Sequence, residues 1–175
     1  IKFNEVTKPV EGDFLVSFAD ITNFGSLVKN MTNTETFDLL KWFYELIGEQ
    51  VEKSGGYVIK FIGDSALIIY NKEDVDKGIK SLYEMKKTID KEFEKKNYNS
   101  KVGINSHIGK AILGKLGGID ALDIIGDTVN TVSMLNENTY IKGGFIISVT
   151  AYRSLNDDTR QLFNKFNLPI VYTAE

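Results

Sequence analysis

The hydrophobic positions near the start of the chain predict a strand followed by a helix. Residues 13–22, DFLVSFADIT, form a continuous apolar run that ends in polar residues, which is typical of a strand buried on both faces. Residues 32–56 repeat apolar side chains at helical spacing and close on Gly55-Gly56, a stop signal for a helix. The apolar positions of this predicted helix are Phe37, Leu40, Tyr44, Ile47 and Val51.

Two short apolar runs then stand on either side of a turn. Residues 57–62, YVIKFI, and 65–70, SALIIY, are separated only by Gly63-Asp64. Strands around a two-residue turn that contains glycine predict a β-hairpin. Lys60 stands inside the first run, close to Asp64 along the chain, although the hairpin otherwise reads as buried. These two charges need an explanation.

The second half of the chain predicts a surface helix and further strands. Residues 72–96 place Val75, Ile79, Leu82, Ile89 and Phe93 on one face, with lysines and acids elsewhere. The later predicted elements are a glycine-rich strand in 101–118, a short strand and turn in 121–126 with a helix that opens near Asp127, a strand in 143–149, a helical segment in 150–163 and a last strand in 168–174. The order β-α-β-β-α-β predicts an α+β fold with a ferredoxin-like βαββαβ core and extra C-terminal elements.

Composition narrows the classes of partner. The length fits one domain over residues 1–175, and the net charge of −3 argues against nucleic acid or an anionic membrane as a partner. The absence of cysteine excludes disulfides, thiolate metal sites and a cysteine nucleophile, and it agrees with a cytoplasmic location. With neither a long apolar run nor the apolar core of a signal peptide, we expect no direct membrane contact from this segment. Because the chain begins without methionine, we expect it to be part of a longer chain.

Four charged residues fall near the ends of predicted core strands. Asp20 closes the first strand, Asp64 lies in the hairpin turn, Lys60 lies on one hairpin arm, and Asp123 follows the glycine-rich strand. In a β-α-β-β unit the first strand and the hairpin can be neighbours, so Asp20 and Asp64 can converge. Two carboxylates at one spot repel each other unless a cation lies between them. Hard oxygen ligands that leave positions open suit magnesium.

Each of these residues also has a purely structural interpretation. Asp20 is equally suited to cap the helical turn that follows its strand. Asp64 and Asp123 are common turn residues, and Lys60 on an alternating strand would face solvent. The case for chemistry therefore depends on their joint arrangement.

That arrangement resembles the catalytic domain of class III nucleotidyl cyclases, the adenylyl and guanylyl cyclases. The resemblance is carried by four motifs in order: VSFADITNFGSL, KFIGDSALIIY, VGINSHIGKAILGKLGG and LDIIGDTVNTVSML. It runs from about Phe14 to Tyr172, nearly the whole chain. The fold that it implies agrees with the predicted order of elements.

The resemblance implies a metal site and a phosphate site. Asp20 and Asp64 match the two aspartates that bind a pair of Mg²⁺ or Mn²⁺ ions, with the backbone carbonyl of Ile21 as a further ligand. One ion would activate the ribose 3′-hydroxyl, and the other would hold the triphosphate. The residues that would offer backbone N–H groups to the phosphates at a helix N-terminus are Asn23, Phe24, Gly25 and Ser26.

The resemblance also implies a site shared between two copies of the domain. In the family, two domains pack head to tail with the nucleotide at the seam, as a homodimer or a heterodimer of cyclase domains. Lys60 and Asp123 match the positions that read the purine; lysine can donate to adenine N1 and aspartate can accept from the exocyclic amine, which favours ATP over GTP. Asn130 matches the asparagine that orients the ribose from the partner side. Lys60 and Asp64 of one hairpin would then serve two different sites.

Three positions depart from the family pattern. Met134 stands where the family usually has an arginine that neutralises charge on the α-phosphate. For the lysine that contacts the terminal phosphates, Lys165 and Lys142 are both candidates, and the sequence does not choose between them. His107 stands where the family commonly has a small residue, and we interpret it as structural.

The favoured function is an adenylyl cyclase, a phosphorus–oxygen lyase that converts ATP to 3′,5′-cyclic AMP and pyrophosphate. Two alternatives stay open. A catalytically weak or inactive nucleotide-binding module with a regulatory role would explain Met134. A cyclase for another nucleotide, a pyrimidine, would require a different use of Lys60 and Asp123.

Overall fold

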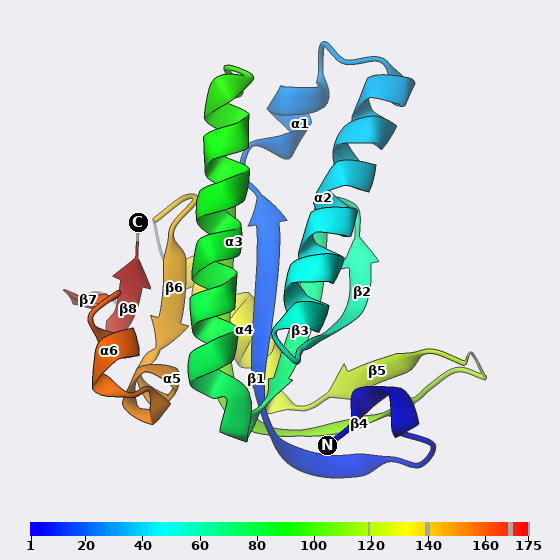
Figure 1. Cartoon of the computed structure of the whole chain (residues 1–175), viewed down its shortest axis with the longest axis vertical. Coiled ribbons are helices and arrows are strands. Elements are labelled where there is room, and N and C mark those ends of the chain that lie inside the picture. The colour runs from blue at the N-terminus through cyan, green and yellow to red at the C-terminus, as the bar shows by residue number, and fades with distance from the viewer. Residues whose placement is uncertain (119, 139–140, 168–169, 175) are drawn as a thin grey trace.

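The computed structural model describes residues 1–118, 120–138, 141–167 and 170–174 (Figure 1). Its strands form an eight-stranded sheet in the order β2-β3-β1-β4-β6-β8-β7, with β5 paired to β4 off this path. The strands are β1 (Val10–Ile21), β2 (Tyr57–Ile62), β3 (Ser65–Asn71), β4 (Val102–Lys115), β5 (Leu122–Ile125), β6 (Phe145–Ser148), β7 (Asn164–Asn167) and β8 (Ile170–Ala174). The helices are α1 (Phe24–Val28), α2 (Asn33–Lys53), α3 (Val75–Lys95), α4 (Asp127–Asn138), α5 (Val149–Ser154) and α6 (Asp157–Arg160), with short 3₁₀ turns at Phe3–Glu5 and Lys72–Asp74. Among the described residues, no helix combines the length and the apolarity needed to cross a membrane.

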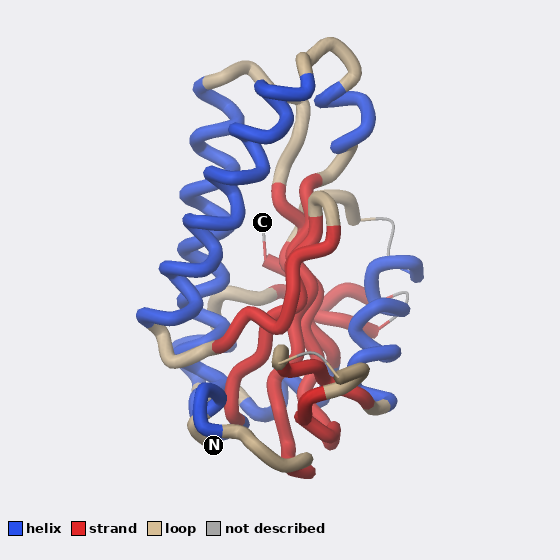
Figure 2. Tube along the Cα trace, turned by 90° about the vertical axis from the view of Figure 1, so that its right-hand side faces the viewer, coloured by secondary structure: helices blue, strands red, loops and turns tan. Residues whose placement is uncertain are grey.

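The first four strands form the ferredoxin-like core that the sequence predicts. β1 pairs antiparallel with β3 on one side and with β4 on the other, and β2 completes the hairpin with β3. The long helices α2 and α3 cover one face of the sheet, and α4 covers the other face (Figures 1 and 2). The predicted α+β fold with extra C-terminal elements is therefore confirmed.

α2 begins at a capping box, but its buried face differs from the prediction. The side chain of Thr32 accepts a hydrogen bond from the Glu35 backbone N–H at 3.2 Å, and Glu35 accepts one from the Thr32 N–H at 2.7 Å. The residues that α2 buries are Leu39, Phe43, Ile47 and Val51. Phe37, one of the apolar positions at helical spacing, is 66% exposed and does not belong to the buried face. Phe37 lies two positions before Leu39, which places it on the far side of a helix with 3.6 residues per turn.

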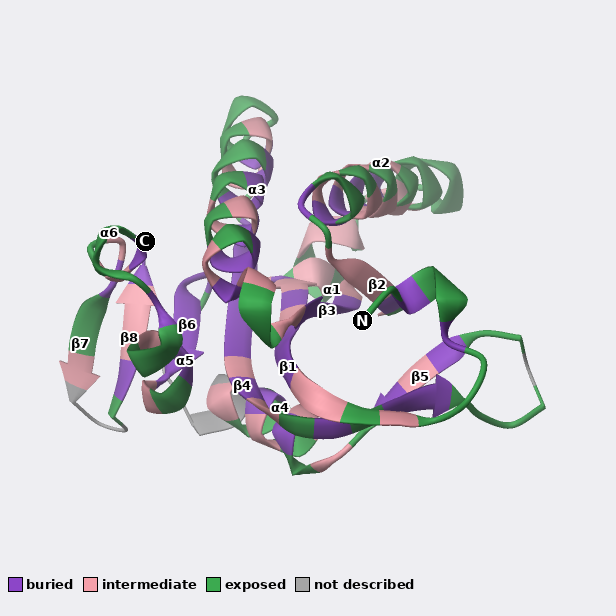
Figure 3. Ribbon diagram, turned by 60° about the horizontal axis from the view of Figure 1, so that its bottom comes forward, coloured by how far each residue is buried: buried purple, intermediate pink, exposed green. Residues whose placement is uncertain are grey.

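The apolar face predicted for α3 is confirmed, and it includes one buried cation (Figure 3). The buried residues of α3 are Val75, Gly78, Ile79, Leu82, Met85, Lys86, Ile89 and Phe93. The Lys86 ammonium forms an ion pair with Asp90, which lies one helical turn away. Asp90 also accepts a hydrogen bond from the Val102 backbone N–H at 2.7 Å. This contact holds the last turns of α3 against the start of β4.

The hairpin is present as predicted, with an irregularity at Lys60. The pairing of β2 with β3 shifts register between Val58 and Lys60, as at a β-bulge. Ile59 is buried in the apolar cluster that also contains Val132 of α4, whereas Lys60 is exposed. The bulge thus directs a charged side chain away from both apolar layers.

The C-terminal part differs from the prediction in two respects. The helical segment predicted for 150–163 is split into α5 and α6, because the Asn156 side chain accepts a hydrogen bond from Thr159 N–H at 2.9 Å and starts a new helix. Strand β7 was not predicted; it pairs with β8 at the edge of the sheet. The first two residues of the predicted strand 168–174 lie outside the described residues.

Candidate active site

The end of β1 and the turn of the hairpin meet at one place. Asp20 pairs in register with Ser65 of β3 and with Gly103 of β4, so it lies at the centre of the core sheet. The next residue, Ile21, donates its backbone N–H to the carbonyl oxygen of Asp64 at 3.2 Å. The sheet thereby brings Asp20 and Asp64 together although they are far apart in sequence.

Asp20 and Asp64 line a cavity of about 550 Å³. The other lining residues are Ile21, Thr22, Asn23, Phe24, Gly25, Gly103, Asn105, Ile141, Lys142, Gly143, Gly144 and Ile146. The walls therefore come from the loop after β1, from β4 and from the loop and strand around β6. The cavity lies at the ends of β1, β4 and β6, which are adjacent strands of the sheet.

The electrostatics of the cavity favour a positively charged occupant. Burial, and then the nearby charge of Asp64, raise the pKa of Asp20 from 3.8 to about 6. Gly103 makes room for this carboxyl group, because a Cβ at that position would stand 3.2 Å from Asp20 Oδ1. The Tyr44 hydroxyl donates to the Gly63 carbonyl oxygen beside Asp64, and burial together with the Asp64 charge raises the pKa of Tyr44. Two acids held this way repel each other until a cation joins them.

The residues present fit a hard divalent cation. In the described part of the chain, no three His, Cys, Asp or Glu side chains come together as metal ligands. The candidate ligands are instead the carboxylates of Asp20 and Asp64, and Ile21, whose carbonyl is predicted to bind the metal, lines the same cavity. Mg²⁺ and Mn²⁺ bind oxygen ligands of this kind, and Mg²⁺ usually keeps positions for water and substrate phosphates.

The predicted phosphate turn lies at the cavity only in part. Phe24 and Gly25 line the cavity, whereas Ser26 lines a neighbouring pocket with Asn30 and Met31. Asn23 adopts a left-handed backbone with φ of 56°, which directs the chain into α1. α1 has only 5 residues, so its dipole adds little and free backbone N–H groups remain the main attraction for an anion.

Lys60 and Asp123 are paired with each other, outside this cavity. Lys60 Nζ lies 2.7 Å from Asp123 Oδ2, and the two side chains are 42% and 31% exposed. The other carboxylate oxygen of Asp123 accepts a hydrogen bond from the Ile124 backbone N–H at 2.9 Å. β2 and β5 thus present a matched donor and acceptor on the surface, away from the two aspartates of the same chain.

Asn130 and Met134 lie on α4 and also stay outside the cavity. Residues four apart on a helix share a face, and both side chains are exposed, Met134 by 56%. Val132, on the opposite side of α4, is fully buried against the sheet. The cavity of one chain therefore contains the two aspartates, whereas Lys60, Asp123, Asn130 and Met134 do not line it.

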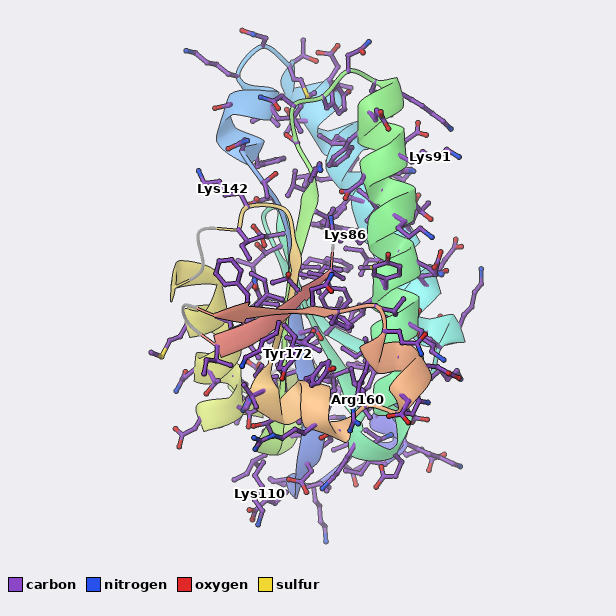
Figure 4. The ribbon with its side chains drawn as sticks, turned by 90° about the vertical axis from the view of Figure 1, so that its left-hand side faces the viewer. Lys86, Lys91, Lys110, Lys142, Arg160 and Tyr172 are labelled. Atoms are coloured by element: carbon purple, nitrogen blue, oxygen red, sulfur yellow. The ribbon has the colours of Figure 1, made fainter. Side chains whose placement is uncertain are left out.

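The structure separates the two lysine candidates and explains the histidine. Lys142 lines the cavity from the loop before β6, and no described carboxylate pairs with it. Lys165 lies on β7 in register with Tyr172 of β8 and does not line the cavity; Lys142 and Tyr172 are labelled in Figure 4. His107 Nδ1 lies 2.7 Å from the Ser148 hydroxyl, which also caps α5, and burial lowers the pKa of His107. His107 does not line the cavity.

Asn105 is a cavity residue that sequence reasoning missed. It lies on β4 in register with Phe18, on the face of the sheet that also carries Asp20. It is 1% exposed, and it lines the same cavity. The available signal was a single amide side chain within a glycine-rich strand that also carries other polar residues, and by itself it points to no particular chemistry.

Comparisons with known proteins identify the family. Residues 6–170 match the family model of the adenylate and guanylate cyclase catalytic domain. An adenylate cyclase of Anabaena cylindrica is 25% identical over 152 residues, which cover 81% of this chain and 30% of that protein. The chain thus spans less than a third of that curated relative.

Solved structures show the same fold. The adenylyl cyclase CyaB from P. aeruginosa superimposes with a TM-score of 0.80 at 20% identity and covers 96% of each chain. The guanylyl cyclase Cya2 superimposes with a TM-score of 0.77 at 15% identity, over 94% of this chain and 92% of that chain. The family match and the shared architecture lead to one conclusion. The chain belongs to the adenylate and guanylate cyclase catalytic domain family, the class III nucleotidyl cyclases.

Proposed function

We propose that this domain is an adenylyl cyclase that converts ATP to 3′,5′-cyclic AMP and pyrophosphate. The observation that carries the proposal is the cavity in which Asp20 and Asp64 meet, in a chain of the cyclase family. Burial and the neighbouring carboxylate raise the pKa of Asp20, and a divalent cation in the cavity would stabilise its charged form. A domain without chemistry to perform has no evident need for two acids in such a place.

The reaction is an in-line displacement at phosphorus. The ribose 3′-oxygen forms a bond to the α-phosphorus and releases its proton to water, and the bond from the α-phosphorus to the pyrophosphate oxygen breaks, so that pyrophosphate leaves. Asp20, Asp64 and the Ile21 carbonyl would hold two Mg²⁺ or Mn²⁺ ions, which supply Lewis-acid activation of the 3′-hydroxyl and charge stabilisation on the triphosphate. The backbone of Phe24 and Gly25 positions the phosphates.

Lys142 is the cation that we assign to the phosphates. It reaches the cavity from the same chain as the aspartates, and it has no competing carboxylate among the described residues. Lys165 lacks the first of these properties, since it lies on β7 at the edge of the sheet and does not line the cavity. The family usually has an arginine at the position of Met134, where it neutralises charge on the α-phosphate. In this chain Lys142 takes over part of that neutralisation.

The rest of the site comes from a second copy of the domain. Lys60, Asp123 and Asn130 lie outside the cavity of their own chain, which supports their use in a partner's cavity. In a head-to-tail dimer with twofold symmetry, both sites are completed in the same way. The Lys60 ammonium donates to adenine N1 and the Asp123 carboxylate accepts from the exocyclic amine, whereas guanine would oppose both contacts.

The direct test measures cyclic-nucleotide formation by the purified domain with Mn²⁺ and each of the four common nucleoside triphosphates. We expect cyclic AMP from ATP as the main product. Asp20→Ala and Asp64→Ala should each abolish turnover while circular dichroism shows an intact fold. Turnover that persists in either variant would exclude the assignment of these aspartates.

Met134 favours a second candidate function, a regulatory module that binds nucleotide without turning it over. Methionine cannot stabilise negative charge, and loss of one such donor lowers a rate by about 10²–10³-fold. Measurable nucleotide binding with no product from any triphosphate would support this module. A cyclic pyrimidine product would instead overturn the assigned use of Lys60 and Asp123.

A further inference from the structure

Asn105 occupies the floor of the cavity beside the two aspartates. On β1, Asp20 pairs in register with Gly103, and Phe18 pairs with Asn105. Side chains two apart on a strand share a face, so Asn105 follows Gly103 on the face that carries Asp20. Gly103, which lies opposite Asp20 and next to Asn105 on this face, carries no side chain. Ile146 of β6, the register partner of Asn105, closes the far side of this floor.

The Asn105 amide oxygen is buried and unsatisfied. The residue is 1% exposed, and Oδ1 has no hydrogen-bond partner among the described residues. Buried polar atoms in folded proteins nearly always have a partner, and one that lacks a partner requires an explanation. Since the atom lies at the wall of a cavity, the missing donor is expected to come from a molecule that the cavity binds.

The groups around Asn105 Oδ1 indicate which hydrogen-bond donor it binds. An amide oxygen beside two carboxylates repels a phosphate oxygen, which is also an acceptor. A hydrated divalent cation satisfies all three groups, because its coordinated waters are strong donors and Mg²⁺ retains several of them when bound to protein. Residues that hold such waters orient the primary ligands and tune the affinity for the metal.

We propose that Asn105 is a positioning residue of the metal site, whose Oδ1 accepts a hydrogen bond from a water on the cation held by Asp20 and Asp64. This inference rests on the metal assignment in the proposed function and adds a residue that does not bind the ion directly. Asp20, Asp64 and the Ile21 carbonyl would hold the ions, and the Asn105 amide would hold a coordinated water. The sequence pattern of paired aspartates does not contain this residue.

The experiment replaces the amide by an apolar group of similar size and measures metal affinity directly. In Asn105→Leu, binding of Mn²⁺ is followed by the electron paramagnetic resonance signal of the free ion, with Mn²⁺ alone and again with 3′-deoxy-ATP, which cannot cyclise. We expect affinity about 10–100-fold lower than in the wild type. The melting temperature without metal should stay equal or rise, because the variant removes an unpaired buried acceptor.

Two further variants separate a metal role from a structural one. Asn105→Asp keeps an acceptor oxygen and should bind Mn²⁺ at least as tightly as the wild type. Ser106→Ala is the matched control: Ser106 is the buried neighbour on the opposite face of β4, where its hydroxyl lies 2.7 Å from that of Ser17. This variant should lower the melting temperature and leave the Mn²⁺ affinity unchanged.

The outcomes distinguish this inference from the proposed function. Wild-type affinity in Asn105→Leu, combined with lost affinity in Asp20→Ala, overturns the role of Asn105 and leaves the metal site in place. A lower melting temperature in Asn105→Leu with unchanged affinity also overturns it, since it shows a structural role. Absence of Mn²⁺ binding by the wild type under both conditions overturns the inference together with the metal assignment.

Discussion

At the scale of single residues, Asp20 makes the metal-free domain sensitive to pH. The pKa of Asp20 is about 6 in the folded state and 3.8 in the unfolded state. Its contribution to the stability of the fold is therefore complete below pH 3.8 and is lost as the pH rises through about 6. At neutral pH the buried charge therefore lowers the free energy of unfolding by roughly 3 kcal/mol relative to acid.

Asp20→Asn removes this titration and keeps the shape of the side chain. We expect the metal-free variant to be more stable than the wild type at pH 7.5 by up to ~3 kcal/mol, and the difference to vanish below about pH 4. Urea unfolding across this range measures it. Burial lowers the pKa of His107, which makes the fold more stable as the pH rises. Both proteins contain His107, so this effect cancels in the difference between them. A constant difference at all pH values would contradict the burial of a charged Asp20.

Met134 is the residue at which the family pattern fails, and its exposure makes it open to replacement. With 56% of its surface exposed on α4, it can become arginine without disturbing the core. We expect Met134→Arg to raise kcat by about 10²-fold, because a fixed cation then faces the charge that develops at the α-phosphate. Met134→Leu should leave kcat unchanged. An equal kcat in all three proteins would show that another cation, such as Lys142, already serves this role.

At the scale of elements, the sequence predicts those parts whose signals are local. The Gly55-Gly56 stop after α2, the Gly63-Asp64 turn and the apolar face of α3 determine their elements directly, so these predictions agree with the structure. β7 contains only 4 residues, NKFN, and becomes a strand because β8 pairs with it. No property of the segment alone carries that information.

The hairpin and β5 together present the proposed base-reading pair, and the contribution of this ion pair to stability should be small. Exposed ion pairs contribute about 0–1 kcal/mol, and both Lys60 and Asp123 are substantially exposed. We therefore expect Lys60→Ala to shift the melting temperature little. The KM for ATP should rise at least ~10-fold and the preference for ATP over GTP should fall, because a donor to adenine N1 is lost. Lys72→Ala, which removes another exposed ion pair with Asp13 at 3.3 Å, is the control. Unchanged nucleotide preference would exclude Lys60 as a base-reading residue.

At the scale of the whole molecule, the cavity of one chain holds only some of the residues of the proposed site. Asp20 and Asp64 could be placed together from the sequence because the βαββ order makes their strands neighbours. Asn105 could not, since its significance depends on Gly103 leaving space and on a missing partner, which only three-dimensional contacts reveal. Lys142 likewise could not be preferred over Lys165 from the sequence, because only the structure shows that Lys142 lines the cavity.

The division of the site between two copies is tested by mixing two inactive variants. Asp64→Ala loses a metal ligand and Asn130→Ala loses the ribose contact, so each homodimer should be inactive. In a mixed dimer, one site combines the intact Asp64 of one chain with the intact Asn130 of the other. With equal amounts and random pairing, half of the dimers are mixed and each has one working site of two, which predicts about a quarter of the wild-type rate. Two different affinity tags allow the mixed dimers to be isolated, and their rate should then reach about half of the wild-type value. If isolated mixed dimers remain inactive, Asn130 and Asp64 act in the same chain and the shared-site geometry is wrong.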